Sequence, residues 1–277
     1  MHITITLFPL VLSLLSFTLK AENHQYAVNK VNYKHLVANL YLPITEKKLP
    51  VVIAFGGFEG GLEAGNATGE MIAPRGMAVL ALAYFKEKGL PKTLDQIPME
   101  YFIEAINYIE TNPLLDSSRI GVVAGSRGSE AAFILATLDF RIKSLAVTTP
   151  SKVAWYGLTV PKSAWTFMGQ DVPALGLALD SRSTVIDRFS TALENENNVK
   201  NSLFRFENIN GPLLMISAEY DQVWPSFKMA KDIETYLKNK NFKHNISHNT
   251  YKTGHGFSKE TVPDIKNSII NHFLNTL

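Results

Sequence analysis

The sequence predicts an α/β fold in which a mostly parallel sheet is covered by helices on both faces. Short continuous apolar runs, such as residues 50–55 and 119–124, are typical of strands that are buried on both sides. Stretches with apolar residues at helical spacing alternate with these runs, which favours strand–helix–strand units. The long stretch 150–210 interrupts this alternation and predicts a cap-like insertion over the carboxyl edge of the sheet.

The elements follow one another along the chain as alternating strands and helices. A first strand is indicated by weak alternation and β-forming residues, the central strands by apolar runs, and the last strand by a poorer pattern. The predicted strands cover residues 36–42, 50–55, 77–85, 119–124, 142–148, 213–217 and 245–251. Apolar residues three or four apart, with Pro98 suited to a first helical turn, indicate the main helices. The predicted helices cover residues 66–73, 99–109, 129–138, 227–237 and 262–273.

The amino terminus has the pattern of a targeting segment. Residues 3–19 form an uncharged apolar run, and Lys20 and Ala21 follow it before polar sequence begins. We therefore predict a signal peptide over residues 1–21 and one domain over residues 22–277 that contains the insertion. A secreted or periplasmic protein without a stable membrane span is then expected. An uncleaved anchor is the alternative, and a leader that does not function would leave the protein cytoplasmic.

Composition excludes several classes of function. The 27 Lys and Arg residues nearly balance the 25 Asp and Glu residues, which gives no reason to expect nucleic acid as a partner. The chain has no cysteine, so disulfides, thiolate zinc sites, iron–sulfur clusters and a cysteine nucleophile are ruled out. No metal or other cofactor is expected, and the oligomeric state stays open.

The stretch 121–129 carries the most specific motif. A buried strand ends in Ala124-Gly125-Ser126-Arg127-Gly128, and a helix follows. This is the pattern of a nucleophile elbow with alanine in place of the first glycine, in which a strained turn exposes the serine hydroxyl above the sheet. An ordinary glycine-rich turn between a strand and a helix is the alternative interpretation.

A serine nucleophile needs a base and a group that orients the base. In folds with this elbow the chain order is serine, acid, histidine, and Asp221 and His255 follow the predicted strands 213–217 and 245–251 in that order. Both lie in loops at the carboxyl edge of the sheet, where ligands bind in open α/β sheets. Asp221 is preferred to Glu219, and His255, with glycine on both sides, is preferred to the other histidines near the sheet, His244 and His248.

Two backbone N–H groups are needed to bind the oxygen that becomes negative in the transition state. The first expected donor is Arg127, directly after Ser126. The second is expected from the glycine-rich loop 55–61, where Gly57 and Phe58 are the candidates and the sequence does not separate them. A phosphate-binding loop is the alternative for these glycines, but the spacing fits neither of the common nucleotide-binding patterns.

With these motifs in view, the chain resembles the catalytic domain of the acyl-CoA thioesterase and bile acid-CoA:amino acid N-acyltransferase family. The resemblance extends from about residue 35 to the carboxyl terminus and is weakest in the insertion. It rests on residues 50–57, 76–85, 90–92, 99–108, 125–128, 221–224 and 254–255. The resemblance implies an α/β-hydrolase fold and gives Ser126, Asp221 and His255 the roles of nucleophile, acid and base. Because family members with serine hydrolyse their substrates whereas those with cysteine transfer the acyl group to amino acids, hydrolysis is expected.

The expected substrate is therefore a small-molecule acyl ester or thioester. Trp155, Trp165 and Phe167 in the insertion are expected to line an acyl pocket, or alternatively to form a packed cap core. The side chain of Arg127 is expected either to be exposed at the helix start or to touch an anionic leaving group. Two other functions stay open: a carboxylesterase similar to dienelactone hydrolase, and a non-catalytic binding protein with a hydrolase fold.

Overall fold

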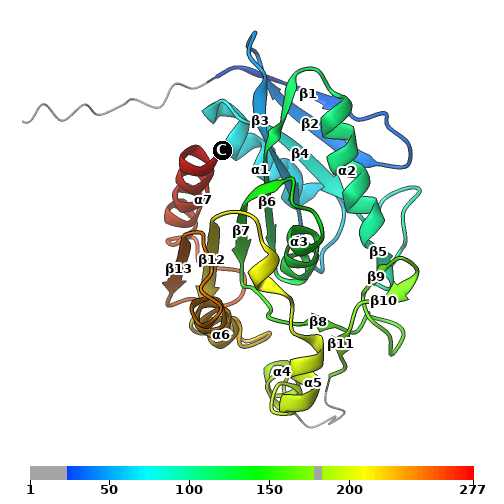
Figure 1. The fold of residues 1–277 in the computed structure, drawn as a ribbon, viewed down its shortest axis with the longest axis vertical. Coiled ribbons are helices and arrows are strands. Elements are labelled where there is room, and N and C mark those ends of the chain that lie inside the picture. Colours follow the sequence, from blue (N-terminus) through cyan, green and yellow to red (C-terminus); the bar gives the residue numbers. More distant parts are fainter. Residues whose placement is uncertain (1–23, 178–182) are drawn as a thin grey trace, which may run out of the picture.

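The computed structural model describes residues 24–177 and 183–277. It confirms the predicted α/β class: one eight-stranded, mostly parallel sheet is flanked by helices (Figure 1). The signal peptide predicted over residues 1–21 lies outside the described residues. Within them, no helix combines the length and the apolar character that crossing a bilayer requires.

The central sheet has the strand order β1-β2-β4-β3-β6-β7-β12-β13. The pairs from β4 to β13 are parallel, whereas β2 is antiparallel to both β1 and β4. The strand β1 was not predicted, because its residues after the first are exposed and lack an apolar pattern. The bounds are β1 (Tyr26–Lys30), β2 (Val37–Pro43), β3 (Leu49–Phe55), β4 (Ala78–Ala83), β6 (Leu115–Gly125), β7 (Ile142–Thr148), β12 (Leu213–Ala218) and β13 (Ile246–Tyr251).

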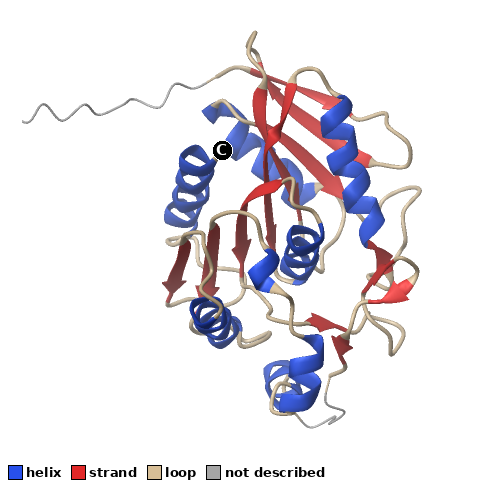
Figure 2. Cartoon of the chain, in the orientation of Figure 1, coloured by secondary structure: helices blue, strands red, loops and turns tan. Residues whose placement is uncertain are grey.

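Helices cover both faces of this sheet, as Figure 2 shows. The helices α2 (Met99–Thr111), α3 (Arg127–Leu138) and α6 (Ser226–Asn239) bury their apolar residues in one core layer. On the other face, α1 (Glu63–Ile72), the short η1 (Ala73–Arg75) and α7 (Val262–Thr276) contribute to a second layer.

Strand β3 shows why the central strands are apolar throughout. Val51, Ile53 and Phe55 point into the layer that contains α2 and α3, whereas Val52 and Ala54 point into the layer that contains α1 and α7. Alternate side chains of a strand face opposite sides of the sheet, so a strand covered on both sides needs apolar residues at every position. The carboxyl edge of the sheet is thus carried by strands that are covered on both faces.

The stretch between β7 and β12 has secondary structure of its own. It contains the helices α4 (Val185–Ala192) and α5 (Glu196–Ser202), the turn η2 (Phe206–Asn208), and four short strands. These strands are β8 (Ala154–Trp155), β9 (Trp165–Phe167), β10 (Gln170–Asp171) and β11 (Ala174–Leu175), and β9 also pairs with β5 (Ile97–Pro98). The pairing of β9 with β5 ties the insertion to the loop before α2.

Candidate active site

Ser126 lies at a sharp turn between β6 and α3. Its φ of 52° and ψ of −128° fall in a region that residues other than glycine rarely adopt. The Ser126 N–H donates to the carbonyl of Thr148 at 3.0 Å, and the Ser126 carbonyl accepts the N–H of Ser129 at 2.8 Å. Such strain persists only where the surrounding structure holds it, and it is concentrated at functional sites. The turn has the conformation that the nucleophile-elbow motif requires.

His255 reaches Ser126 from the loop after β13. Its Nε2 lies 2.8 Å from the Ser126 hydroxyl oxygen, which is hydrogen-bonding distance. The backbone N–H of His255 donates to the side-chain oxygen of Gln222 at 3.2 Å, and the ring packs edge-on against Trp224. The base candidate is therefore fixed both at its backbone and at its ring.

Asp221 holds the opposite side of the imidazole. Each of its carboxylate oxygens lies 2.9 Å from Nδ1 of His255. The carboxylate also accepts the N–H groups of Val223 and Trp224 and the hydroxyl of Ser226, the last at 2.6 Å. Because Asp221 is buried, these donors replace the water that would otherwise solvate its charge. The structure thus brings the three predicted side chains into one chain of hydrogen bonds.

The glycine-rich loop after β3 packs directly against the elbow. A Cβ atom on Gly57 would lie 2.9 Å from Cβ of Ser126, 2.8 Å from the carbonyl oxygen of Gly125 and 3.2 Å from the backbone nitrogen of Arg127. Only glycine fits this approach, which brings the backbone of Gly57 beside Ser126 and beside the backbone nitrogen of Arg127, the first predicted oxyanion donor. Phe58, the other candidate, is exposed and does not line the pocket at Ser126.

The side chain of Arg127 has neither of its expected positions. It is buried, and its Nε lies 2.6 Å from Oε1 of Glu130, whose side chain is fully buried. A terminal nitrogen also donates to the carbonyls of Trp155 and Tyr156. The sequence could not reveal this burial, because the two carbonyls that Arg127 binds come from the insertion, although Glu130 lies three residues further on in the same helix. Arg127 joins the elbow helix to the cap, and it is not a surface group or a leaving-group contact.

The two tryptophans of the insertion belong to the packed interior and do not line the pocket at Ser126. The indole of Trp165 donates to Oε2 of Glu130 at 2.8 Å, and the indole of Trp155 donates to the hydroxyl of Ser151 at 2.8 Å. The half-buried Phe167 packs against the main core. The expectation of an acyl pocket lined by these residues is therefore corrected: each buried N–H needs a partner, and the partners draw the rings inward.

Glu130 is the centre of this buried network. Burial raises its pKa to about 7, although Arg127 and the N–H groups of Trp155 and Trp165 lower it. Removing one member of a buried ion pair leaves the other charge without compensation, which typically costs about 3–5 kcal/mol. We therefore expect Glu130→Ala to lower the free energy of unfolding by about that amount at pH 8, as measured by urea denaturation.

The matched control for this substitution is Glu110→Ala. Glu110 pairs with Arg141 at 2.7 Å, but its side chain is 44% exposed, and exposed pairs contribute at most about 1 kcal/mol. A double change of Arg127 to methionine and Glu130 to leucine is expected to cost less than Glu130→Ala, because no unpaired charge remains. Equal losses for Glu130→Ala and Glu110→Ala would contradict the role assigned to the pair.

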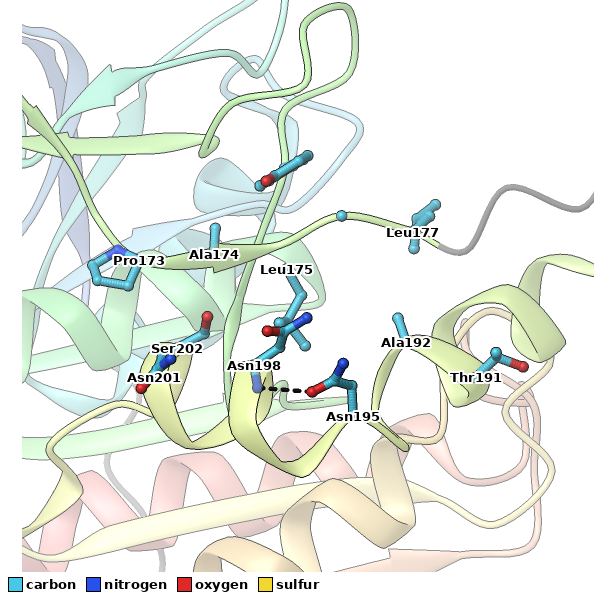
Figure 3. Close-up of a pocket in the computed structure, with 12 residues that line it drawn as sticks. Pro173, Ala174, Leu175, Leu177, Thr191, Ala192, Asn195, Asn198, Asn201 and Ser202 are labelled. Carbon is cyan, nitrogen blue, oxygen red and sulfur yellow. Dashed lines mark hydrogen bonds between the residues drawn. The ribbon is translucent and has the colours of Figure 1, made fainter.

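The pocket at Ser126 has a volume of about 270 Å³. Its lining includes Ser126, His255, Gly56, Gly57 and Glu59. A larger pocket of about 500 Å³ lies in the insertion between β11 and the helices α4 and α5, and it shares no lining residue with the first (Figure 3). Among the described residues, no group of three or more histidine, aspartate or glutamate side chains is arranged to hold a metal ion.

Among the site residues that were not predicted from the sequence are Tyr84, Ser226 and Glu59. The Tyr84 hydroxyl donates to the carbonyls of Gly56 and Gly57, at 2.9 and 3.1 Å, and Ser226 donates to Asp221. Glu59 accepts the N–H of Gly57. Tyr84 directly follows the apolar strand β4 and Ser226 begins the amphipathic helix α6, so both belong to patterns that indicate structure. Only Glu59 gave a signal, as the one acidic residue within the glycine-rich loop.

Comparison of the sequence with known families and proteins gives one consistent result. A family model described as "BAAT / Acyl-CoA thioester hydrolase C terminal" matches residues 97–275. Acyl-coenzyme A thioesterase 1 of Mus musculus is 28% identical over 208 residues, which are 73% of this chain and 47% of the relative. Mitochondrial acyl-coenzyme A thioesterase 2 of Rattus norvegicus is 29% identical over 204 residues, 73% of this chain and 43% of the relative. The chain thus spans less than half the length of these curated relatives.

Solved structures place the fold among the α/β hydrolases. A putative dienelactone hydrolase from Klebsiella pneumoniae superposes with a TM-score of 0.61 at 13% identity, covering 90% of this chain and 98% of that one. A puromycin-hydrolyzing peptidase from Mycobacterium tuberculosis gives a TM-score of 0.64 at 14% identity, covering 95% of this chain and 41% of the peptidase. At such low identity the likeness establishes the fold and says nothing about the substrate.

Proposed function

Because the chain belongs to the BAAT / acyl-CoA thioester hydrolase C-terminal family, we propose that it is a serine hydrolase of acyl thioesters and esters. The observation that supports this most strongly is the continuous set of hydrogen bonds from Ser126 through His255 to Asp221. A hydroxyl becomes nucleophilic when a base takes its proton during attack, and an acid behind the base stabilises the cation that forms. A nucleophile, a base and an acid are the side chains that hydrolysis of an acyl ester or thioester by this route needs.

In the first half of the proposed reaction, the Ser126 oxygen attacks the acyl carbon, and His255 Nε2 takes the hydroxyl proton. The carbonyl π electrons move to oxygen, where the N–H groups of Arg127 and Gly57 bind the negative charge. When the carbonyl re-forms, the bond to the leaving thiol or alcohol breaks, and His255 returns the proton to it. An acyl group on Ser126 and a free thiol or alcohol result.

In the second half, water replaces the leaving group. His255 takes a proton from water as the water oxygen attacks the acyl carbon, and the same two N–H groups bind the oxyanion. The bond to Ser126 then breaks, and the proton goes from His255 to the serine oxygen. The products are a carboxylic acid and the regenerated Ser126, and the reaction consumes one water molecule.

The choice between thioester and oxygen ester rests on the curated relatives, which are named as acyl-coenzyme A thioesterases. We therefore expect the purified protein to hydrolyse butyryl thioesters with a higher kcat/KM than the matched oxygen esters. The measurement is a panel of thioester and ester pairs with the same acyl group, with Ser126→Ala as the blank. A thioester-to-ester ratio below one would assign the protein as a carboxylesterase, and no Ser126-dependent turnover of any pair would contradict the proposed function.

A further inference from the structure

One buried side chain holds the glycine-rich loop beside the elbow. Tyr84 directly follows β4, the strand that pairs with β3, and its side chain is buried. The Tyr84 hydroxyl donates to the carbonyl of Gly56 at 2.9 Å and to that of Gly57 at 3.1 Å. Because burial raises the pKa of Tyr84 well above its ordinary value, the hydroxyl keeps its proton and remains a donor. Two consecutive carbonyls of the loop are therefore held by one group.

The first turn of α3 also packs against the Gly56 carbonyl. A Cβ atom on Gly128 would collide with that carbonyl oxygen, so the oxygen lies directly against the backbone of Gly128. The carbonyl of Gly56 and the N–H of Gly57 belong to one planar trans peptide and point in opposite directions. Since the carbonyl faces Tyr84 and α3, the N–H of Gly57 faces away from both.

The acceptor of the Gly57 N–H shows where this donor points. The N–H donates to Oε1 of Glu59 at 2.8 Å, and Glu59 lines the pocket that contains Ser126 and His255. A carboxylate oxygen thus binds the donor that the negative oxygen of the transition state needs. Because Glu59 is exposed, water can solvate its carboxylate when a substrate oxygen takes its place on the N–H.

Packing of its ring fixes the position of the Tyr84 hydroxyl. The ring centroid lies 5.8 Å from that of Phe55 and 5.2 Å from that of Phe102, and both of these rings are buried. Side chains in a close-packed core stay in their rotamer minima, so the hydroxyl is held at one place. Its hydrogen bonds go to the loop and its ring contacts go to other aromatic residues of the core, not to the three proposed catalytic side chains.

We propose that Tyr84 is a positioning residue, whose hydroxyl orients the peptide between Gly56 and Gly57 so that the Gly57 N–H binds the oxyanion together with the N–H of Arg127. This rests on the proposed serine hydrolase function and adds to it a residue that touches neither the substrate nor the reacting atoms. Oxyanion donors stabilise the transition state most when they are in place before the reaction begins. Without the hydroxyl, a peptide between two glycines has little else to keep it from rotating, because glycine adopts many backbone conformations.

Tyr84→Phe removes the hydroxyl and keeps the ring, so it tests the orientation of the peptide with little change in packing. We expect kcat for a butyryl thioester to fall about 10- to 100-fold, which is less than outright loss of an oxyanion donor causes, while KM stays within about threefold. The second readout is the inhibition constant Ki of butyl trifluoromethyl ketone, whose adduct with Ser126 carries an oxyanion. This Ki is expected to rise by the same factor as kcat falls, whereas a merely structural role would not couple the two.

Tyr101→Phe is the matched control. The Tyr101 hydroxyl also donates to a backbone carbonyl, that of Ala83 at 2.7 Å, but Ala83 belongs to β4 and not to the glycine-rich loop. Because this hydroxyl orients no group at the site, its loss is expected to leave kcat and the Ki of the ketone within about twofold. Circular dichroism confirms that each variant is folded.

A crystal structure of the wild-type protein with the ketone bound decides even if Tyr84→Phe does not fold. The adduct oxygen is expected within about 3.1 Å of the Gly57 nitrogen, with Glu59 displaced and the hydrogen bond from Tyr84 to Gly56 kept. An adduct oxygen out of reach of Gly57 would overturn the proposal. So would a folded Tyr84→Phe with wild-type kcat and Ki, or equal losses in the control. Failure of the function itself is distinct, since the wild-type protein would then neither hydrolyse the thioester nor bind the ketone.

Discussion

Replacing either Ser126 or His255 with alanine is expected to lower kcat by about five to six orders of magnitude. The two side chains are 2.8 Å apart and act in the same proton transfer, so the loss of one makes the other useless. The double variant is therefore expected to be no slower than either single variant. Hydrolysis of a butyryl thioester by each purified variant, compared with the uncatalysed rate, provides the measurement.

His244→Ala is the control for the histidine. His244 packs beside Phe242 and does not contact the site, so its loss is expected to change kcat by no more than about twofold. Additive losses in the double variant would show that Ser126 and His255 do not act as a unit. Activity that survives in Ser126→Ala would show that a residue other than Ser126 is the nucleophile.

The second large effect is expected from Asp221→Asn, which should lower kcat by about three to four orders of magnitude. The carboxylate accepts from Nδ1 of His255 through two oxygens at 2.9 Å. An amide of the same shape can present its N–H₂ group to the ring, which stabilises the tautomer with the proton on Nε2 and prevents that nitrogen from accepting the serine proton. The carboxylate charge that stabilises the imidazolium is also lost.

Glu219→Gln is the control for Asp221→Asn, because Glu219 is the other acidic residue in this loop that the sequence left as a candidate. Glu219 is exposed and accepts the hydroxyl of Thr250 at 3.1 Å, so its loss is expected to leave kcat within about twofold. Circular dichroism of both variants distinguishes a loss of orientation at His255 from a loss of folding. Equal effects of Asp221→Asn and Glu219→Gln would contradict the assignment of Asp221.

Local patterns predicted the fold because the central strands are buried on both faces. Strand β3 and the second half of β6 are continuous apolar runs, and a parallel sheet covered by amphipathic helices on both faces buries such runs. The edge strand β1 was missed since four of its five residues are exposed. The other strands of the central sheet were predictable because their apolar residues indicate burial.

At the site, residues that belong to a motif were predictable, and those that depend on long-range partners were not. The positions of Ser126, Asp221 and His255 follow from strand ends, which the sequence marks. The burial of Arg127 depends on carbonyls of the insertion as well as on Glu130. The inward position of Trp165 likewise depends on Glu130, which lies 35 residues earlier in the chain. Glu59 could be placed against the Gly57 N–H only once the loop's path was known.

Covalent labelling tests the central claim most directly, because it asks whether the Ser126 hydroxyl is activated. The wild-type protein is treated with a fluorophosphonate, and the site of modification is read by mass spectrometry of its peptides. The account predicts one phosphonyl group per chain, on Ser126, with no labelling of Ser126→Ala and much slower labelling of His255→Ala. A folded wild-type protein that takes up no label, or one that is labelled equally when Ser126 is replaced, would contradict it.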